Sequence, residues 1–259
     1  MGLADLLNWN LSLFLLIFSR WAGMVMIAPV FGARGVPGMV KLGLAVSMAI
    51  VVFPLLTATA PAIPQELFPF VALLIKEILV GLVIGFVINL ITAVMQGAGQ
   101  LMDFQIGFLM ANTIDPIHGM QSPMTGNFLL IITTMLLLAT NAHHYIIAAL
   151  VKSYEYLPLN PSTVPYSVAF FIDITAKVIA LSLQIAMPIY GAILLAEIGV
   201  GLLSKAVPQL NMFSVLFAVK IIFGLGLLLV MIPFFGDTVT RVFNQIMQWV
   251  FELLRGWSR

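Results

Sequence analysis

Long apolar runs, separated by short polar or proline-rich connectors, account for most of this chain. A transmembrane helix needs about 20 consecutive, mostly apolar residues, and each of these runs approaches or exceeds that length. The pattern predicts an all-α integral membrane protein with about six long apolar helices. The runs cover residues 11–31, 39–57, 70–95, 128–151, 168–198 and 212–235.

The stretch at 95–127 breaks this pattern. It combines two carboxylates, Asp103 and Asp115, with no Lys or Arg. It also holds glycines at 97, 99, 107, 119 and 126 and prolines at 116 and 123. Non-helical backbone at membrane depth is tolerated only where it is buried in protein or lines an aqueous cavity. We therefore expect this stretch to lie inside the protein or beside a channel, and not against lipid.

The last residues, 237–259, form a different kind of helix. Apolar side chains recur there at intervals of three and four residues, opposite polar ones, which predicts an amphipathic C-terminal helix. Such a helix could lie on a membrane or pack on a partner. The apolar positions are Val239, Val242, Phe243, Ile246, Met247, Val250, Leu254 and Trp257.

Two features argue against six upright spans. The run at 168–198 is too long for one upright span. Lys and Arg are also almost evenly divided between alternate connectors, so the positive-inside rule gives no orientation. We expect bent helical hairpins that form a single membrane domain over residues 1–259, with buried polar groups satisfied by neighbouring subunits.

Composition strengthens the membrane assignment and excludes several function classes. The chain is 62% hydrophobic and 8% charged, with a mean hydropathy of +1.13. A net charge of +1, carried by scattered basic residues, argues against a nucleic-acid partner. The absence of cysteine removes disulfides and thiolate sites. No basic segment precedes the first apolar run, so we expect that helix to be retained.

Charged residues inside the apolar runs need partners. Arg20 should face protein or water or reach the interface, unless it marks the end of a short helix. The neighbours Lys76 and Glu77 either meet groups on another helix or sit near the interface. Gly81 and Gly85 have a GxxxG spacing, which allows another helix to approach closely.

Other charges lie in the later runs. Asp173 and Lys177 are spaced i, i+4 in the favourable acid-before-base order, as in a structural ion pair. Glu197 and Lys220 have no obvious partner within the chain. We expect buried charges to make subunit contacts, and the candidates are Lys76, Glu77, Asp173, Lys177, Glu197 and Lys220.

Chemistry-bearing motifs are missing. His143 and His144 are adjacent, and two neighbours on a helix cannot chelate one metal. There is no HExxH motif and no Ser–His pair at a recognisable spacing. We predict no catalytic residue, no metal site and no cofactor, which argues against an enzyme. A small-solute transporter is the alternative from another class, but the inverted repeat that it requires is not found.

Several segments together resemble one family. In chain order they are FGARGVPGMVKLGLA from Phe31, KEILVGLVIGFVINL from Lys76, GQLMDFQIGF from Gly99 with the later IDP at 114–116, YLPL from Tyr156, and GLLSKAVPQLNMFSVLFAVKI from Gly201. Their order and spacing are similar to those of the FliR family of export-gate subunits. The resemblance runs from about residue 20 to residue 236, and it favours a flagellar over a virulence type III secretion member.

The resemblance implies a non-enzymatic role in the bacterial inner membrane, at the flagellar basal body. Members of this family join FliP-like and FliQ-like subunits in a helical, channel-forming assembly. They work beside FlhA and FlhB to pass unfolded export substrates. The fold expected from the family consists of bent helical hairpins in contact with partners and membrane lipid.

The resemblance also assigns a pore-closing loop to the broken stretch. Met and Phe side chains supply a deformable, water-excluding constriction, and glycines allow movement. The alternative is that these methionines only fill gaps in a subunit core. The loop residues are Gly107, Phe108, Met110, Asp115, Pro116, Met120 and Pro123, and the expected anchor residues before the loop are Met102, Asp103 and Gln105.

Overall fold

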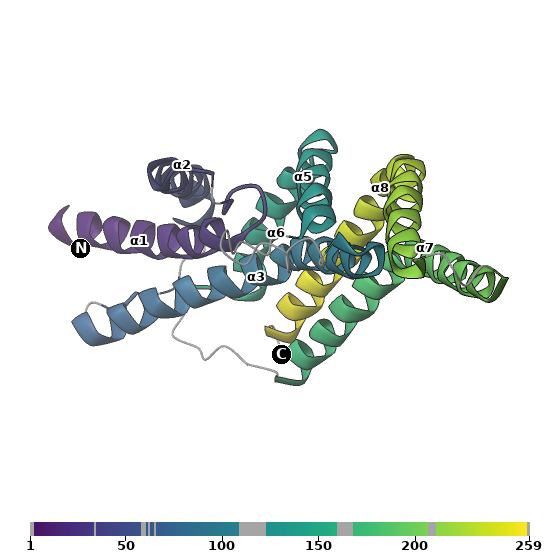
Figure 1. The fold of residues 1–259 in the computed structure, drawn as a ribbon. Helices are drawn as coiled ribbons and strands as arrows, with labels where there is room; N and C mark the ends of the chain where they lie inside the picture. The colour runs from purple at the N-terminus through teal and green to yellow at the C-terminus, as the bar shows by residue number, and fades with distance from the viewer. Residues whose placement is uncertain are drawn as a thin grey trace. The chain divides into compact units, whose positions relative to one another are not determined.

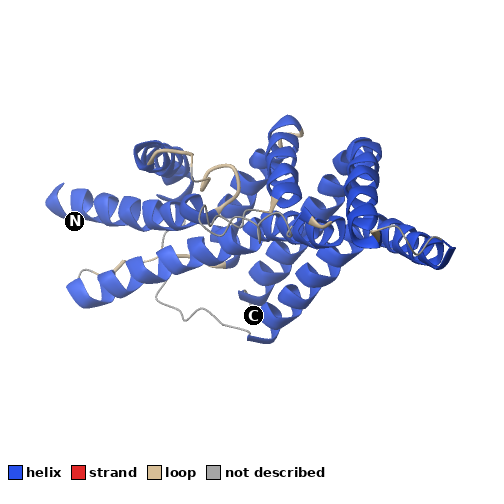
Figure 2. Ribbon diagram, in the orientation of Figure 1, coloured by secondary structure: helices blue, strands red, loops and turns tan. Residues whose placement is uncertain are grey.

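The computed structural model describes residues 3–33, 35–57, 61, 63–64, 66–108, 123–159, 168–206 and 211–257. Every regular element within these ranges is an α-helix (Figure 2). Four helices are long and apolar enough to cross a membrane, or five if one bent pair counts as a span. The predicted all-α, multi-pass membrane fold is therefore confirmed. The helices are α1 (Leu3–Ile27), α2 (Gly38–Thr57), α3 (Leu67–Ile106), α5 (Met124–Ala139), α6 (Ala142–Tyr156), α7 (Val168–Ala206) and α8 (Met212–Trp257) (Figure 1).

Several helix ends differ from the predicted ones. α3 continues to Ile106, so the first third of the stretch at 95–127 is helical, and the prediction that it is broken from residue 95 is wrong. The run at 212–235 and the amphipathic tail are one continuous helix, α8. The run at 128–151 is instead divided into α5 and α6, which form a pair bent by 74°. Asn141 has a left-handed φ of 56° at the break, which ends the first helix.

Contacts divide the chain into two compact units. Unit 1 comprises Met1–Leu90, Leu137–Phe171 and Asn244–Arg259. Unit 2 comprises Ile91–Leu136 and Ile172–Phe243. Each unit therefore collects segments that are distant in sequence.

Unit 1 is built around a close contact between α1 and α3. A Cβ atom on Gly81 would lie 2.0 Å from the Arg20 carbonyl oxygen, and one on Gly23 would lie 2.4 Å from the Ile78 carbonyl oxygen. Gly85 lies similarly close to the backbone of Met24. The expected role of the GxxxG spacing is confirmed, because no larger residue fits between these backbones.

The end of α8 completes the core of unit 1. Ile246, Val250 and Leu254 have no exposed side-chain surface, and Trp249 is 3% exposed. Lys152 of α6 lies over the ring of Phe251, 5.7 Å from its centroid. The amphipathic face is thus buried inside this chain, whereas the sequence suggested a membrane surface or a partner.

Unit 2 is built around the last turns of α3. The hydroxyl of Ser182 on α7 donates to the Val94 carbonyl oxygen at 3.0 Å. Gly224 on α8 lies against the Ile106 side chain, and a Cβ atom on Gly224 would be 2.7 Å from the Ile106 Cγ1. Most of the apolar surface of α7 and α8 in this unit is exposed.

Candidate functional site

The candidate site lies where α3 ends and α5 begins, within unit 2. Of the predicted pore-closing loop, Gly107, Phe108 and Pro123 are within the described residues. The other four loop residues, Met110, Asp115, Pro116 and Met120, lie outside the described residues. The described residues of the loop therefore lie at its two ends.

Gly107 ends α3 in a conformation that requires glycine. Its φ is +96°, which L side chains rarely adopt. Its N–H donates to the Asp103 carbonyl oxygen at 3.0 Å. A Cβ atom here would also lie 3.3 Å from the ring of Phe217 on α8. The chain thus turns off the helix axis at one defined residue.

Asp103 joins the last turn of α3 to the first turn of α5. The Thr125 N–H donates to both carboxylate oxygens of Asp103, at N–O distances of 3.0 and 3.1 Å. Asp103 has no exposed surface and Thr125 is 3% exposed. The first N–H groups of a helix have no partner within it, and the helix dipole favours a negative group there. Asp103 therefore caps α5 from another helix.

A second contact lies one helical turn before Asp103. A Cβ atom on Gly99 would be 2.3 Å from the Gly126 Cα. A Cβ atom on Gly126 would be 3.1 Å from the Pro123 ring and 3.2 Å from the Gln96 carbonyl oxygen. The two backbones touch, so Gly99 and Gly126 permit close helix packing and do not break a helix.

Two further predicted anchor residues lie beside this contact. Met102 is fully buried, and Gln105 is 5% exposed. The Gln105 Nε2 atom has no hydrogen-bond partner within the part of the chain that the structure describes. Their anchoring role stays a prediction.

Unit 1 contains a buried polar cluster centred on Arg20. The Arg20 Nε donates to the Glu77 carboxylate at 2.6 Å, and Nη1 donates to the Ser153 hydroxyl at 3.0 Å. Nη2 donates to the Leu157 carbonyl oxygen at 3.0 Å, and the guanidinium lies 4.2 Å from the centroid of the Tyr154 ring. Arg20 and Glu77 are both fully buried. One side chain thus links α1, α3 and the α6 region.

This cluster answers the question that the sequence left open about Arg20. The helix continues to Ile27, so Arg20 does not mark a helix end, and it faces protein. Lys76 is not buried with it in the same way: its Nζ lies 4.0 Å from the second Glu77 oxygen and is partly exposed. Ser153 and Tyr154 were missed at the sequence level, although a serine beside a tyrosine in an apolar helix is the kind of signal that could have found them.

Two further ion pairs join charged residues of the described part of α7 and α8. Lys220 donates to Glu197, joining α8 to α7. Lys177 and Asp173 pair at 2.7 Å along α7, as the i, i+4 spacing predicted. The expectation that Glu197 and Lys220 have no partner within the chain is wrong, because the two residues are 23 positions apart and on different helices. Glu77 meets Arg20 on another helix, which was one of the two alternatives for it. A role in subunit contacts stays a prediction.

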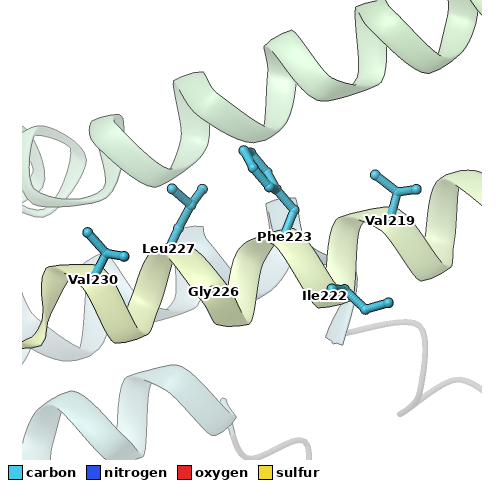
Figure 3. A pocket seen from close by; sticks show the side chains of 6 residues that line it. All are labelled: Val219, Ile222, Phe223, Gly226, Leu227 and Val230. Atoms are coloured by element: carbon cyan, nitrogen blue, oxygen red, sulfur yellow. The ribbon is translucent and has the colours of Figure 1, made fainter.

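α8 also carries a small apolar groove in unit 2. It has a volume of ≈ 510 Å³. Figure 3 shows Val219, Phe223, Leu227 and Val230 along one side of the helix, with Ile222 turned away. The lining, completed by Gly226, offers no polar side chain to a solute, and it is suited to packing against apolar groups.

Comparison with known proteins places this architecture in a family. The family model described as bacterial export proteins, family 1, matches residues 11–246. The flagellar biosynthetic protein FliR of Bacillus subtilis (strain 168) is 31% identical over 245 residues, covering 93% of this chain and 94% of the relative. The same-named protein of Escherichia coli (strain K12) is 26% identical, covering 96% and 94%.

A relative that does not carry the FliR name is similar over a smaller share of this chain. The Yop proteins translocation protein T of Yersinia pestis is 29% identical over 222 residues, covering 84% of this chain and 85% of the relative. Similarity of this extent spans both units and both sides of the candidate site. The chain therefore belongs to family 1 of the bacterial export proteins, the multi-pass membrane family of type III export apparatus subunits that includes the flagellar biosynthetic protein FliR.

Proposed function

We propose that this chain is a non-enzymatic subunit of the flagellar type III protein export gate, located in the bacterial inner membrane at the flagellar basal body. It forms part of a protein-conducting channel for unfolded export substrates. The observation that carries the proposal is the match to flagellar relatives over more than nine-tenths of both chains.

Within that gate, residues 107–123 act as the pore-closing loop. A pore that passes a polypeptide but retains ions needs a deformable apolar constriction, and Phe and Met side chains supply one. The arrangement of the loop's ends supports this role. Gly107 turns the chain off α3, and Asp103 holds the start of α5 beside the end of α3, so the two ends of the proposed loop lie close together.

Deletion of residues 108–120 tests the loop. We expect the variant to assemble with its partners but to let ions or small molecules leak across the membrane. Leakage would be followed with a pH- or potential-sensitive dye in cells that lack their own copy of the gene. Phe104→Ala is the matched control, since Phe104 is 64% exposed on α3 and lies before the loop. An assembled deletion variant with unchanged leakage would remove the loop from the proposal.

FliP-like and FliQ-like subunits are the proposed channel partners, with FlhA and FlhB beside them. The exposed apolar faces of α7 and α8 provide the surface for helix packing or lipid contact. Affinity purification of the tagged chain from membranes should yield the FliP-like and FliQ-like proteins. A stable, monodisperse monomer that copurifies with neither would argue strongly against this assembly.

The equivalent subunit of a virulence secretion system is the second candidate, and the similarity to the Yersinia protein favours considering it. The two roles separate in a complementation experiment. Expression in a strain without its flagellar FliR should restore swimming motility and not virulence secretion. The opposite result would assign the chain to a virulence system.

A further inference from the structure

We infer that α6 and residues 244–257 of α8 present a water-exposed surface on unit 1 and do not lie in the hydrocarbon layer of the membrane. The inference concerns the surroundings of these two segments and does not depend on the proposed function. Their exposed polar side chains, which we call the polar surface, are those of His144, Tyr145, Lys152, Glu155, Asn244, Gln248, Glu252 and Arg255.

The last part of α8 leaves no apolar side chain uncovered. The exposed positions within residues 244–257 are Asn244, Gln248, Glu252, Arg255 and Gly256. The four side chains follow one another at intervals of three or four residues, so they share one face of the helix. On the other side of the helix, Ile246, Val250 and Leu254 have no exposed surface. The uncovered side of this segment is therefore hydrophilic along its whole length.

The earlier part of α8 has the opposite kind of surface. Ile222 is 74% exposed, Leu229 is 68% exposed and Phe234 is 58% exposed. About 20 apolar residues are enough for one crossing of the hydrocarbon layer, and α8 has 46 residues. The part that begins at Met212 is thus long enough for the crossing by itself, and the last turns of the helix need other surroundings.

α6 has the same distribution as the end of α8. Its exposed positions are His144, Tyr145, Ala148, Lys152 and Glu155, whereas Ile146 and Leu150 are buried. α5, which precedes it, exposes the apolar side chains of Ile131, Met135 and Leu138. The character of the surface changes at the 74° bend between the two helices. This change argues against counting the bent pair as one membrane span.

Lipid does not suit the polar surface. A charged side chain in hydrocarbon is costly, and only long Lys and Arg side chains can extend their charged ends to the interface. Glu155 and Glu252 are shorter and carry carboxylates. The two segments also adjoin, because Lys152 of α6 lies over the ring of Phe251 on α8. Water is the surroundings that suits both, which leaves four candidate spans within the part of the chain that the structure describes.

Single cysteines test the inference, because the chain has none of its own. Gln248→Cys and Glu155→Cys each place a thiol in the polar surface. Leu229→Cys, on the same helix as Gln248, and Met135→Cys, on the other arm of the bent pair, are the matched controls. Leu229 is 68% exposed and Met135 is 66% exposed, so the protein itself covers neither. Native membranes that contain the full chain would be opened by sonication and treated with a small, hydrophilic maleimide. Labelling in SDS gives the total thiol of each variant.

We expect the two thiols of the polar surface to react at least about tenfold faster than the two controls, because the thiolate is the reactive form and apolar surroundings disfavour it. A reaction of either thiol that is no faster than that of its control would overturn the inference. Contact with lipid and cover by another subunit would both give that result.

A second reagent distinguishes two sources of water. A maleimide carried on a long polyethylene glycol chain reaches thiols in bulk solution but does not enter a narrow cavity. Fast reaction with both reagents would place the polar surface in the aqueous phase beside the membrane. Fast reaction with the small reagent alone would place it in a water-filled cavity of an assembled complex. Both results support a water-exposed surface, and they differ only in where the water is.

Discussion

At the scale of single residues, the Arg20 guanidinium is a buried charge that depends on its hydrogen-bond partners. It is fully buried, and three of its donors are used by Glu77, Ser153 and the Leu157 carbonyl group. A buried ion pair is held in place because the loss of one partner leaves the other charge uncompensated. The cluster therefore fixes how α1, α3 and the α6 region pack together.

Substitution of Arg20 should reveal this dependence. Arg20→Met leaves the Glu77 carboxylate buried and should lower the free energy of unfolding by about 3–5 kcal/mol. The double variant Arg20→Met with Glu77→Leu should recover most of that loss, because no charge remains. Thermal unfolding of the purified chain measures both. Gln248→Ala, at an exposed position of α8, is the control and should change stability by about 0.5 kcal/mol or less. Equal losses in the single and double variants would contradict the argument.

Sequence reasoning succeeded in part at this scale. It predicted that Arg20 faces protein or water, because a cation in an apolar helix has few alternatives. It could not identify Glu77 or Ser153 as partners, since they are 57 and 133 residues away. The same limit applies to Asp103, whose partner Thr125 is on the far side of the broken stretch.

At the scale of helices, glycine decides which elements lie in contact. Gly23, Gly81 and Gly85 bring the α1 and α3 backbones together, and Gly99 does the same for α3 and α5. The GxxxG spacing identified the first contact from sequence. Gly97 and Gly99 were misread as helix breakers because a glycine in a break and a glycine in a close contact look alike until the neighbouring helix is known.

The α1–α3 contact is testable with the smallest possible side chain. Gly81→Ala places a Cβ atom 2.0 Å from the Arg20 carbonyl oxygen, so one backbone must shift. We expect a clear loss of the protein from the membrane fraction, measured by immunoblotting. Gly43→Ala is the matched control, because a Cβ atom on this α2 glycine meets nothing within 4 Å. If both variants, or neither, were lost from the membrane fraction, the packing argument would be contradicted.

At the scale of the whole molecule, each unit is assembled from distant segments. Unit 1 takes its first part from residues 1–90 and its last from residues 244–259. The prediction of one membrane domain came from hydropathy, which reports how apolar a segment is but not which segments it meets. The amphipathic pattern of the tail was correctly recognised, yet only the fold reveals that its apolar face from Ile246 onward belongs to the core of unit 1.

A charge on that face should disrupt unit 1. Val250→Asp would bury a carboxylate among apolar side chains at a position with no exposed surface, at a cost of several kcal/mol. We expect faster cleavage of the chain by protease in detergent. Gln248→Asp, at an exposed position in the same helix, should leave the cleavage rate unchanged. Equal cleavage of Val250→Asp and the parent would show that the tail does not stabilise this unit.

The position of residues 244–259 also has a consequence for biosynthesis. Because these residues complete a core begun by the first ninety, that core stays unfinished until residues 244–259 have been synthesised. Until then, the early helices of the unit stand in the membrane with part of their apolar surface uncovered. Synthesis of this segment of α8, and not insertion of any one earlier helix, is then the event that commits the first unit to its folded form.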